Sequence, residues 1–315
     1  MKEGVKPLRM EEVPFKEKFI ERYTQLTDWD AYSKSCNTWL RKSIRVNTIK
    51  ISVADLKKRL ESQGWNLTPI PWCKEGFWIQ GERTDLGNLL EHALGYFYVQ
   101  ESASMIPPVV LAPEDHESVL DIAAAPGSKT TQMGQYMHNT GIIAANDITG
   151  DRLASLGINL QRCGMKNVVV MKTKGQYIKG TFDRILLDAP CSGTGTIMKS
   201  MRSAMDWSTG LIERLSVLQK KLIVSAFNNL KENGVMVYST CTMEPQEDEG
   251  VVSYLLEKFP NAKLEEIKLD IKRSKPIMQF GKETYNKEVS KCLRIWPQDN
   301  HTEGFFIARI RKVQP

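Results

Sequence analysis

The stretch SVLDIAAAPGSKT (residues 118–130) runs from an apolar segment through small residues into a polar segment. Residues 118–123 are apolar enough on both faces to predict a strand buried between two layers. Small side chains at 123–128 permit a tight turn, where a ligand can approach the backbone closely. A helix starting near Lys129 would offer that ligand its unpaired N–H groups. The segment therefore predicts a strand, a binding turn and a helix in succession.

The alternation of strand and helix continues to about residue 240. Because the strands are apolar on both faces and helices separate them, the pattern favours a parallel sheet covered on both sides. The segment GFFIARIRK (304–312) is expected to add an antiparallel strand at the edge. Further strands are expected at 141–147, 167–172, 182–189 and 234–240, and a long helix at 210–230. The fold class is therefore α/β.

The first 95 residues show a different pattern. Residues 11–40 are expected to be helical, and 42–51 contain a strand-like alternation. Residues 52–65 predict an amphipathic helix, with Ser52 as N-cap and Gly64 as its end. Residues 68–80 are strand-like again. We expect a small α+β module over 1–95, with helices at its start, and a larger α/β domain over 96–315.

Composition limits the class of protein. The chain has 315 residues, of which 41% are hydrophobic and 25% charged, as in ordinary globular proteins. The N-terminal sequence has no apolar signal region, and no run approaches the roughly 20 apolar residues of a membrane span. Six separated cysteines, without a CxxC pair and with only four histidines, indicate neither a disulfide scaffold nor a metal site. We expect a cytoplasmic, monomeric protein without metal or membrane contact.

Basic residues give a weak indication of a polyanionic partner. The net charge is +6, which many proteins that do not bind nucleic acid share. Two basic clusters in the first module are candidates for phosphate contacts, although a solvated charged face is the alternative. Interleaved tryptophans either stack on bases or, as is commoner, fill the core. The basic residues are Arg41, Lys42, Arg45, Lys57, Lys58 and Arg59, and the tryptophans are Trp65, Trp72 and Trp78.

The ends of the predicted strands carry the polar chemistry. In such sheets, ligands bind beyond the carboxyl ends of the strands. The turn at 123–128 is neither GxGxxG nor a Walker A sequence, because no glycine directly precedes Lys129. Asp147 follows about twenty residues later, where a carboxylate can bind a ribose diol. A nucleoside-containing cofactor is favoured over the alternative that the turn and Asp147 are purely structural.

Two cysteines follow neighbouring strands of the predicted sheet. Asp188 and Cys191 come after one strand, and Cys241 comes after the next. Because these strand ends would be adjacent, we expect a carboxylate and two thiols to converge beside the cofactor crevice. A buried cysteine is usually only a small apolar residue, but both positions lie in turns rich in Gly, Ser and Thr.

Six segments together resemble one known family. They are RVNTIK (45–50), YVQESASM (98–105), AAAPGSKT (123–130), DAPCSGTG (188–195), YSTCT (238–242) and GFFIARIR (304–311). Over residues 43–312 the chain is similar to the Nol1/Nop2/Sun family of S-adenosylmethionine-dependent RNA cytosine-5 methyltransferases, and most closely to its short archaeal-type tRNA enzymes. The resemblance implies a Rossmann-like methyltransferase sheet preceded by a small RNA-recognition-like module.

The resemblance also implies the chemistry. C5 of cytosine is a poor nucleophile until a thiolate adds to C6, which places carbanion character on C5. By resemblance, Cys241 is the attacking thiol, Cys191 assists release and Asp188 holds the base. The chain is thus expected to transfer a methyl group from S-adenosylmethionine to C5 of cytosine in RNA, with tRNA favoured. The expected cofactor-binding residues are Ala123, Ala124, Ala125, Pro126, Gly127, Ser128, Lys129, Asp147, Arg152 and Asp188.

The sequence departs from the family pattern at three places. MKTKGQ (171–176) has no carboxylate where many members contact adenine, Lys199 and Arg202 are shifted, and Asn300 stands where histidine is frequent. Two alternative functions remain open. One is an RNA-binding or ribosome-assembly factor without activity, and the other is a methyltransferase acting on DNA or protein.

Overall fold

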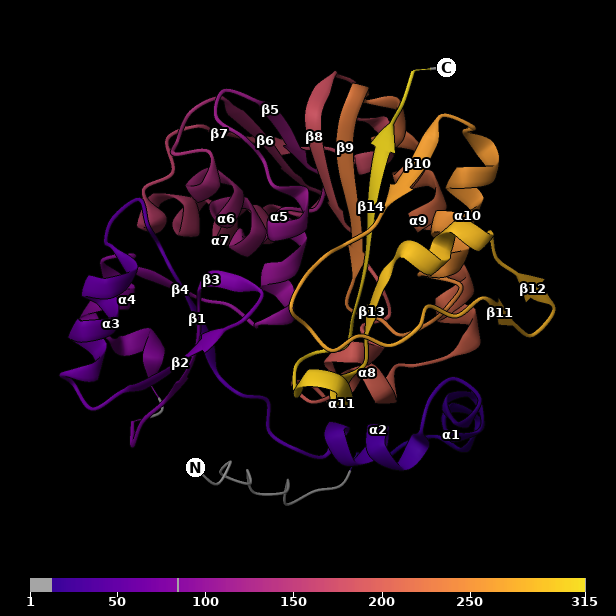
Figure 1. Cartoon of the computed structure of the whole chain (residues 1–315), viewed down its shortest axis with the longest axis horizontal. Helices are drawn as coiled ribbons and strands as arrows, with labels where there is room; N and C mark the ends of the chain where they lie inside the picture. Colours follow the sequence, from indigo (N-terminus) through magenta and orange to yellow (C-terminus); the bar gives the residue numbers. More distant parts are fainter. Residues whose placement is uncertain (1–12, 84, 315) are drawn as a thin grey trace.

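A mixed sheet of eight strands forms the centre of the larger domain (Figure 1). The computed structural model describes residues 13–83 and 85–314, so the N-terminal segment 1–12 discussed above lies outside the described residues. The strand order is β10-β14-β9-β8-β5-β6-β7, and β13 pairs with β14. The strands are β5 (Ser118–Asp121), β6 (Ile142–Asp147), β7 (Val168–Lys172), β8 (Phe182–Asp188), β9 (Leu230–Thr240), β10 (Ala262–Glu265), β13 (Leu293–Ile295) and β14 (Phe305–Lys312).

The pairing confirms the predicted α/β class. Strands β5 to β9 are mutually parallel, and β14 runs antiparallel to β9. The prediction that β14 lies at the edge was wrong, because β10 pairs with its other side. β10 and β13 were not foreseen, since their three or four residues are too few for a period to show.

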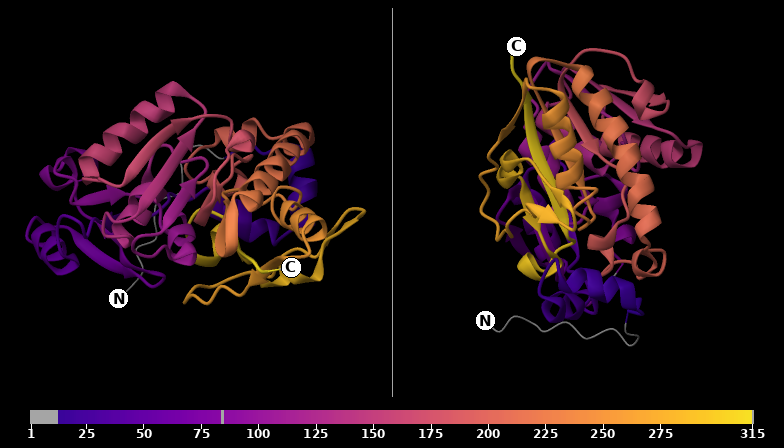
Figure 2. Two further views of the ribbon diagram at one scale, coloured as in Figure 1. Left: turned by 90° about the horizontal axis from the view of Figure 1, so that it is seen from above. Right: turned by 90° about the vertical axis from the view of Figure 1, so that its right-hand side faces the viewer.

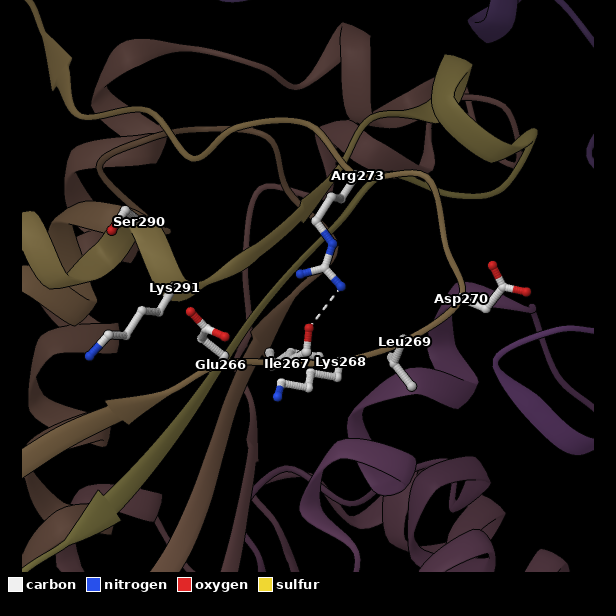
Figure 3. A pocket seen from close by; sticks show the side chains of 8 residues that line it. All are labelled: Glu266, Ile267, Lys268, Leu269, Asp270, Arg273, Ser290 and Lys291. Atoms are coloured by element: carbon white, nitrogen blue, oxygen red, sulfur yellow. Dashed lines mark hydrogen bonds between the residues drawn. The ribbon is translucent and has the colours of Figure 1, made fainter.

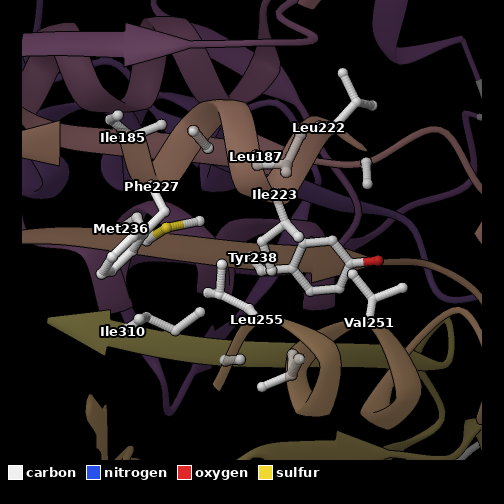
Figure 4. Packing of buried hydrophobic residues seen from close by; sticks show 14 of the residues in the cluster. Ile185, Leu187, Leu222, Ile223, Phe227, Met236, Tyr238, Val251, Leu255 and Ile310 are labelled. Carbon is white, nitrogen blue, oxygen red and sulfur yellow. The ribbon is translucent and has the colours of Figure 1, made fainter. Parts of the chain in front are cut away.

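Helices cover both faces of the central strands (Figure 2). Alternate residues of these strands pack into different clusters. Ile185 and Leu187 of β8 pack in a cluster with α9 (Thr209–Asn228) and α10 (Glu249–Lys258) (Figure 4). Leu186, which points the other way, packs in a cluster with α5 (Ile106–Leu111) and α6 (Ser128–Tyr136). The helix α7 (Gly150–Cys163) covers β6 through Leu156 and Leu160. Both faces are therefore covered, as the two-sided apolar strands predict.

The small module is a four-stranded antiparallel sheet of order β2-β3-β1-β4. Its elements are β1 (Ser43–Val46), α3 (Val53–Glu61), β2 (Asn66–Ile70), β3 (Cys73–Gln80) and β4 (Phe97–Val99). The sheet thus continues beyond residue 95, and the strand-like segment 68–80 is divided by a turn. Ser52 caps α3 as expected, because its Oγ accepts a hydrogen bond from Asp55 N at 3.1 Å.

The predicted phosphate and base contacts of the module are partly wrong. Arg45 is 1% exposed, and its guanidinium donates to Ser128 O (2.7 Å) and Thr131 Oγ1 (2.9 Å) of α6. It therefore joins the two domains and is unavailable to phosphate. Trp65 and Trp72 are buried in the core, which was the favoured alternative, while Trp78 stacks under the Arg41 guanidinium at 3.8 Å.

The helices α1 (Glu17–Thr24) and α2 (Trp29–Cys36) lie against the larger domain and away from the small sheet (Figure 1). Phe19, Tyr23 and Tyr32 pack in one cluster with Trp207 and Trp296. The first 95 residues therefore divide between two packing partners, unlike the single module expected from the sequence.

Short elements complete the described structure. They are α4 (Leu90–Ala93), α8 (Arg202–Met205), α11 (Pro297–Asn300), the hairpin β11 (Gln279–Phe280) and β12 (Glu283–Thr284), and the 3-10 turns η1 (Leu86–Asn88), η2 (Ala103–Met105), η3 (Gly175–Tyr177), η4 (Thr194–Thr196) and η5 (Lys287–Lys291). Across 13–83 and 85–314, each helix is too short or too polar to span a bilayer.

A buried ion triad ties β13 to the start of α10. Arg294 donates to Asp248 at 2.9 Å and to Glu249 at 2.6 Å, and all three side chains are fully buried. Burial raises the pKa of Asp248 well above its ordinary value. The triad therefore stabilises the fold only while the arginine balances both carboxylates.

We expect Arg294→Met to lower the free energy of unfolding by about 3–5 kcal/mol, because two buried carboxylates lose their partner. A carboxyl group whose pKa is raised in the folded state makes the protein less stable as the pH rises. The decrease in the free energy of unfolding caused by Arg294→Met should therefore be larger at about pH 8 than at about pH 5. Urea denaturation at both pH values measures this.

Lys231→Met serves as the control, since its ion pair with Asp183 is partly exposed and should contribute at most about 1 kcal/mol. Equal losses in the two variants would contradict a special role for the triad.

Candidate active site

The turn between β5 and α6 is closely tied to the end of β6. Ala124 N donates to Asn146 O at 2.8 Å, and Gly127 N donates to Ala124 O at 2.8 Å. Gly127 has φ +104°, and a Cβ there would lie 2.9 Å from Leu156 Cδ1. Glycine is therefore required where the chain enters α6.

Asp147 at the end of β6 holds this turn. Its carboxylate accepts hydrogen bonds from Ile148 N (2.8 Å) and Ala125 N (3.3 Å), and the side chain is 2% exposed. Arg152 on α7 lies 3.4 Å from the same carboxylate and donates to Ala125 O at 2.8 Å. The structure thus brings together Ala125, Asp147 and Arg152, as the sequence predicted.

The residues of this turn fit a nucleoside-containing methyl donor. Ala123 and Ser128 are half-buried and Pro126 is exposed, so small side chains leave the turn accessible on one side, whereas Ala124 is buried. A carboxylate at the end of the second strand, as Asp147 is, can accept hydrogen bonds from the hydroxyl groups of a ribose.

Sequence reasoning missed Asp121, the last residue of β5. It is buried, its Oδ2 accepts a hydrogen bond from Thr130 Oγ1 at 2.7 Å, and its Oδ1 has no partner in the described structure. Burial raises its pKa to about 7. An unsatisfied buried oxygen at the cofactor turn is suited to a polar ligand group. Its position directly before the small-residue turn was the signal available in the sequence.

The two predicted thiols lie together. Cys191 Sγ is 3.5 Å from Cys241 Sγ, since β8 and β9 are paired with Asp188 opposite Ser239. The hydrogen bond with Cys241, followed by burial, raises the pKa of Cys191 well above its ordinary value. The raised pKa favours the protonated form of Cys191, and either sulfur can be the donor in their contact.

Lys129 links the cofactor turn to the thiol site. Its Nζ donates to Asp188 Oδ2 at 2.8 Å and to Ser104 Oγ at 3.0 Å. Asp188 Oδ1 accepts a further hydrogen bond from Ser239 Oγ at 2.8 Å. Burial alone lowers the pKa of Lys129, but the Asp188 carboxylate outweighs it and the pKa is raised. Lys129 is therefore a charged partner of Asp188, and each carboxylate oxygen keeps a lone pair for a ligand.

The loop that carries Cys191 is held by a second buried group. Glu247 accepts hydrogen bonds from Ser192 N (3.0 Å) and Gln219 Nε2 (2.7 Å), and Gln219 also donates to Pro190 O at 2.9 Å. Burial raises the pKa of Glu247 to about 7. Sequence reasoning noted only acidic residues after YSTCT, without assigning Glu247 this position.

Close backbone packing holds the other side of the same loop. A Cβ on Gly195 would lie 2.4 Å from Gly304 O and 2.8 Å from Cys241 O, so only glycine fits. Tyr32 of α2 donates from its hydroxyl to Thr194 O at 2.9 Å. The N-terminal helices therefore support the thiol loop, a contact that no local pattern predicts.

The residues that depart from the family pattern form ion pairs and hydrogen bonds within the protein. Lys199 Nζ lies 3.6 Å from Glu303 Oε1, and exposed Arg202 pairs with Asp206 at 3.0 Å. Asn300 donates from Nδ2 to Lys272 O at 2.7 Å. The third departure, the segment 171–176 without a carboxylate, follows β7. There Thr173 N donates to Asn146 Oδ1 at 2.9 Å.

A separate cavity of about 610 Å³ lies between the segment after β10 and η5 (Figure 3). Arg273 crosses it to donate to Ile267 O at 2.7 Å. None of the predicted site residues lines this cavity.

Comparisons with known proteins identify the family of this chain. Residues 108–311 match the family model of 16S rRNA methyltransferase RsmB/F, and 15–102 match the N-terminal domain of 16S rRNA methyltransferase RsmF. A tRNA (cytosine(49)-C(5))-methyltransferase of Pyrococcus abyssi is 49% identical, over 94% of this chain and 96% of that protein. Ribosomal RNA small subunit methyltransferase F of Psychromonas ingrahamii is 44% identical over 89% of this chain, which spans only 58% of that longer protein.

Solved structures show the same likeness. A methyltransferase homologue from Pyrococcus horikoshii aligns with a TM-score of 0.86 and 37% identity, covering 96% of both chains. NSun6 from the same organism, solved with SFG, aligns with a TM-score of 0.83 and 26% identity over 96% of this chain and 100% of that one. The chain therefore belongs to the RsmB/F family of S-adenosylmethionine-dependent RNA cytosine-5 methyltransferases, the Nol1/Nop2/Sun family that its sequence motifs resemble.

Proposed function

We propose that this protein methylates C5 of a cytosine in RNA through a covalent bond between Cys241 and C6. The pair of thiols 3.5 Å apart, next to the Lys129–Asp188 ion pair, is the observation that carries the proposal. S-adenosylmethionine, when bound at the 123–128 turn, supplies an electrophilic methyl group. We take tRNA as the substrate, because the relative that matches almost end to end carries a tRNA activity in its name.

The first step is addition of the Cys241 thiolate to C6. Donation from the Cys191 thiol stabilises negative charge on the Cys241 sulfur before the attack. The electron pair of the C5–C6 double bond forms a double bond between C4 and C5, and the C4–N3 pair moves to N3, which takes up a proton and returns it once the methyl group is attached. In this proposal the Asp188 carboxylate accepts hydrogen bonds from that N3–H and from the exocyclic amine. The resulting carbanion character at C5 allows a C–C bond to the methyl group to form.

The last steps restore the aromatic ring. Once the Cys241 sulfur is bonded to carbon, it no longer carries the charge that kept the proton on Cys191. Cys191 then loses its proton to solvent and, as a thiolate, takes the proton from C5. The C5–H electrons re-form the double bond, the bond from C6 to sulfur breaks, and Cys241 leaves as a thiolate. All six cysteines are free, which fits the reducing cytoplasm in which we place the reaction.

The function is tested by incubating the protein with labelled S-adenosylmethionine and, separately, total RNA, DNA and protein. We expect label in RNA, and sequencing should map it to 5-methylcytosine in tRNA. Label in DNA or protein would point to the other methyltransferase alternative. RNA binding without transfer would indicate an inactive binding factor.

Variants that lack one of the two thiols should stop at different stages of the reaction. Cys241→Ala should be inactive and form no adduct, because the step that activates C5 is lost. Cys191→Ala should attack and methylate but stall with RNA attached, giving a denaturant-resistant band on a gel. The Cys191→Ala, Cys241→Ala double variant should lack that band. If Cys241→Ala traps RNA instead, Cys191 is the nucleophile; if neither traps it, the release role of Cys191 is wrong.

Asp147→Ala should weaken S-adenosylmethionine binding by about 1–3 kcal/mol, the usual effect of deleting a buried hydrogen-bonding group. Calorimetry with the folded variant measures the change directly. Asp151→Ala, which removes an exposed carboxylate from the start of α7, is the matched control and should bind normally. Unchanged affinity in Asp147→Ala would remove Asp147 from the cofactor site.

A further inference from the structure

A groove between η3, α9 and α10 is lined by lysines. It has a volume of about 800 Å³ and includes residues 176–179, the C-terminal half of α9 and one side of α10. Lys179, Lys220, Lys221 and Lys258 line it, whereas no aspartate or glutamate does. In Figure 1, α9 and α10 lie on the opposite side of the central sheet from the small module. The groove is therefore a basic surface distinct from the basic residues of that module.

The charges of this groove are not balanced within the protein. Among the described residues, none of the four lysines forms an ion pair, whereas Lys231, a short distance along the chain, pairs with Asp183 at 2.9 Å. Lys220 and Lys258 both approach one ring, with Nζ atoms 5.5 and 5.7 Å from the centroid of Tyr254. Glu257, beside Lys258, accepts a hydrogen bond from Ser253 Oγ at 3.0 Å. Like charges gathered without a carboxylate favour an anionic ligand.

The groove also has exposed apolar side chains, one of which is aromatic. Tyr177 of η3 is 67% exposed and Val217 of α9 is 53% exposed, so neither side chain contributes much to the core. On α9, Val217, Lys221 and Asn228 are spaced by four and seven residues, which places them on one face of the helix. Lysines combined with an exposed ring suit nucleic acid, because phosphates bind the charges and an unpaired base stacks on the ring.

The helix α9 connects the groove to the loop of the candidate active site. Gln219, which directly precedes Lys220, donates to Pro190 O beside Cys191. Gly175 of η3 fits tightly between the end of β5 and α9, since a Cβ there would lie 2.7 Å from both Ile122 and Leu222. With a rise of 1.5 Å per residue, Asn228 lies about 13 Å along α9 from Gln219. The helix that forms one wall of the groove therefore also holds the loop that carries Cys191.

We propose that this groove, lined by Lys179, Lys220, Lys221, Lys258 and Tyr177, binds the backbone of the substrate RNA beside the target cytosine. The inference rests on the proposed function, since it assigns a second contact to the same substrate. The groove holds RNA by charge and stacking, while the thiol site performs the chemistry. Loss of the groove should therefore affect RNA binding and leave the methyl-transfer step intact.

The test uses Lys221→Gln, Lys258→Gln in the full chain. Its matched control is Lys282→Gln, Lys287→Gln, which removes two exposed lysines near the β11–β12 hairpin and η5. Filter binding with unfractionated tRNA over a series of salt concentrations measures affinity. We expect about a tenfold rise in Kd for the groove variant and a salt slope smaller by about 1–2, as for one or two lost phosphate contacts. The control should retain the parent slope.

Kinetics separate this proposal from the proposed function. The groove variant should show a higher KM for tRNA with kcat unchanged at saturating tRNA. Tyr177→Ala should weaken binding of single-stranded RNA while keeping the salt slope. If the groove variant keeps the parent's affinity for tRNA, the parent's salt slope and normal methylation, the proposal about the groove is wrong and the proposed function stands. Normal tRNA binding by the parent chain without any methyl transfer would instead overturn the proposed function.

Discussion

The parallel pairing of β8 with β9 places Asp188 opposite Ser239, and the candidate active site depends on this register. From that pair, three residues lead to Cys191 and two lead to Cys241, which is how two thiols 50 residues apart in the chain come within 3.5 Å. Leu186 and Leu187 pack into opposite layers, so a slip of one residue would exchange the two faces of β8. The hydrophobic core therefore fixes the geometry of the thiols. Gly195 and Glu247 then hold the loop that follows, one by its lack of a side chain and the other by hydrogen bonds.

Lys129 extends this arrangement to the cofactor turn. Its backbone belongs to the first turn of α6, directly after the small residues at 123–128, while its ammonium pairs with Asp188. The Lys129 ammonium is largely buried and needs a charged partner, so the ion pair links the start of α6 to the end of β8. Arg45 adds a similar constraint from the small module, because its guanidinium donates to groups on α6. The helix that opens the cofactor turn is thus fixed from both domains.

Local patterns in the sequence predicted the parts of this structure that local forces determine. The strands β5 to β9, the capped helix α3 and the convergence of Asp188, Cys191 and Cys241 follow from periodicity and from the rule for parallel strand ends. Three features depend on distant partners and were missed or wrong. Arg45 was predicted as a candidate phosphate contact, but in the structure it is buried and donates a hydrogen bond to Thr131, which lies far along the chain. The internal position of β14 depends on β10, whose four residues give no usable period. The helical character of residues 11–40 was predicted, but the surface against which α1 packs, around Trp207 and Trp296, was not.

In the proposed mechanism one thiol attacks and the other assists release, and the geometry of the thiol pair suits this division. At 3.5 Å, negative charge on both sulfurs is unfavourable, so the pair favours retaining one proton, and the raised pKa of Cys191 favours that residue as its holder. In the proposed mechanism, this contact stabilises the attacking sulfur and disfavours Cys191 as a competing nucleophile. When the Cys241 sulfur becomes bonded to carbon, its charge disappears, and the largest cause of the raised pKa of Cys191 disappears with it, while burial remains. The proposal thus gives the two thiols different roles in order, first to stabilise the attacking sulfur and afterwards to accept a proton.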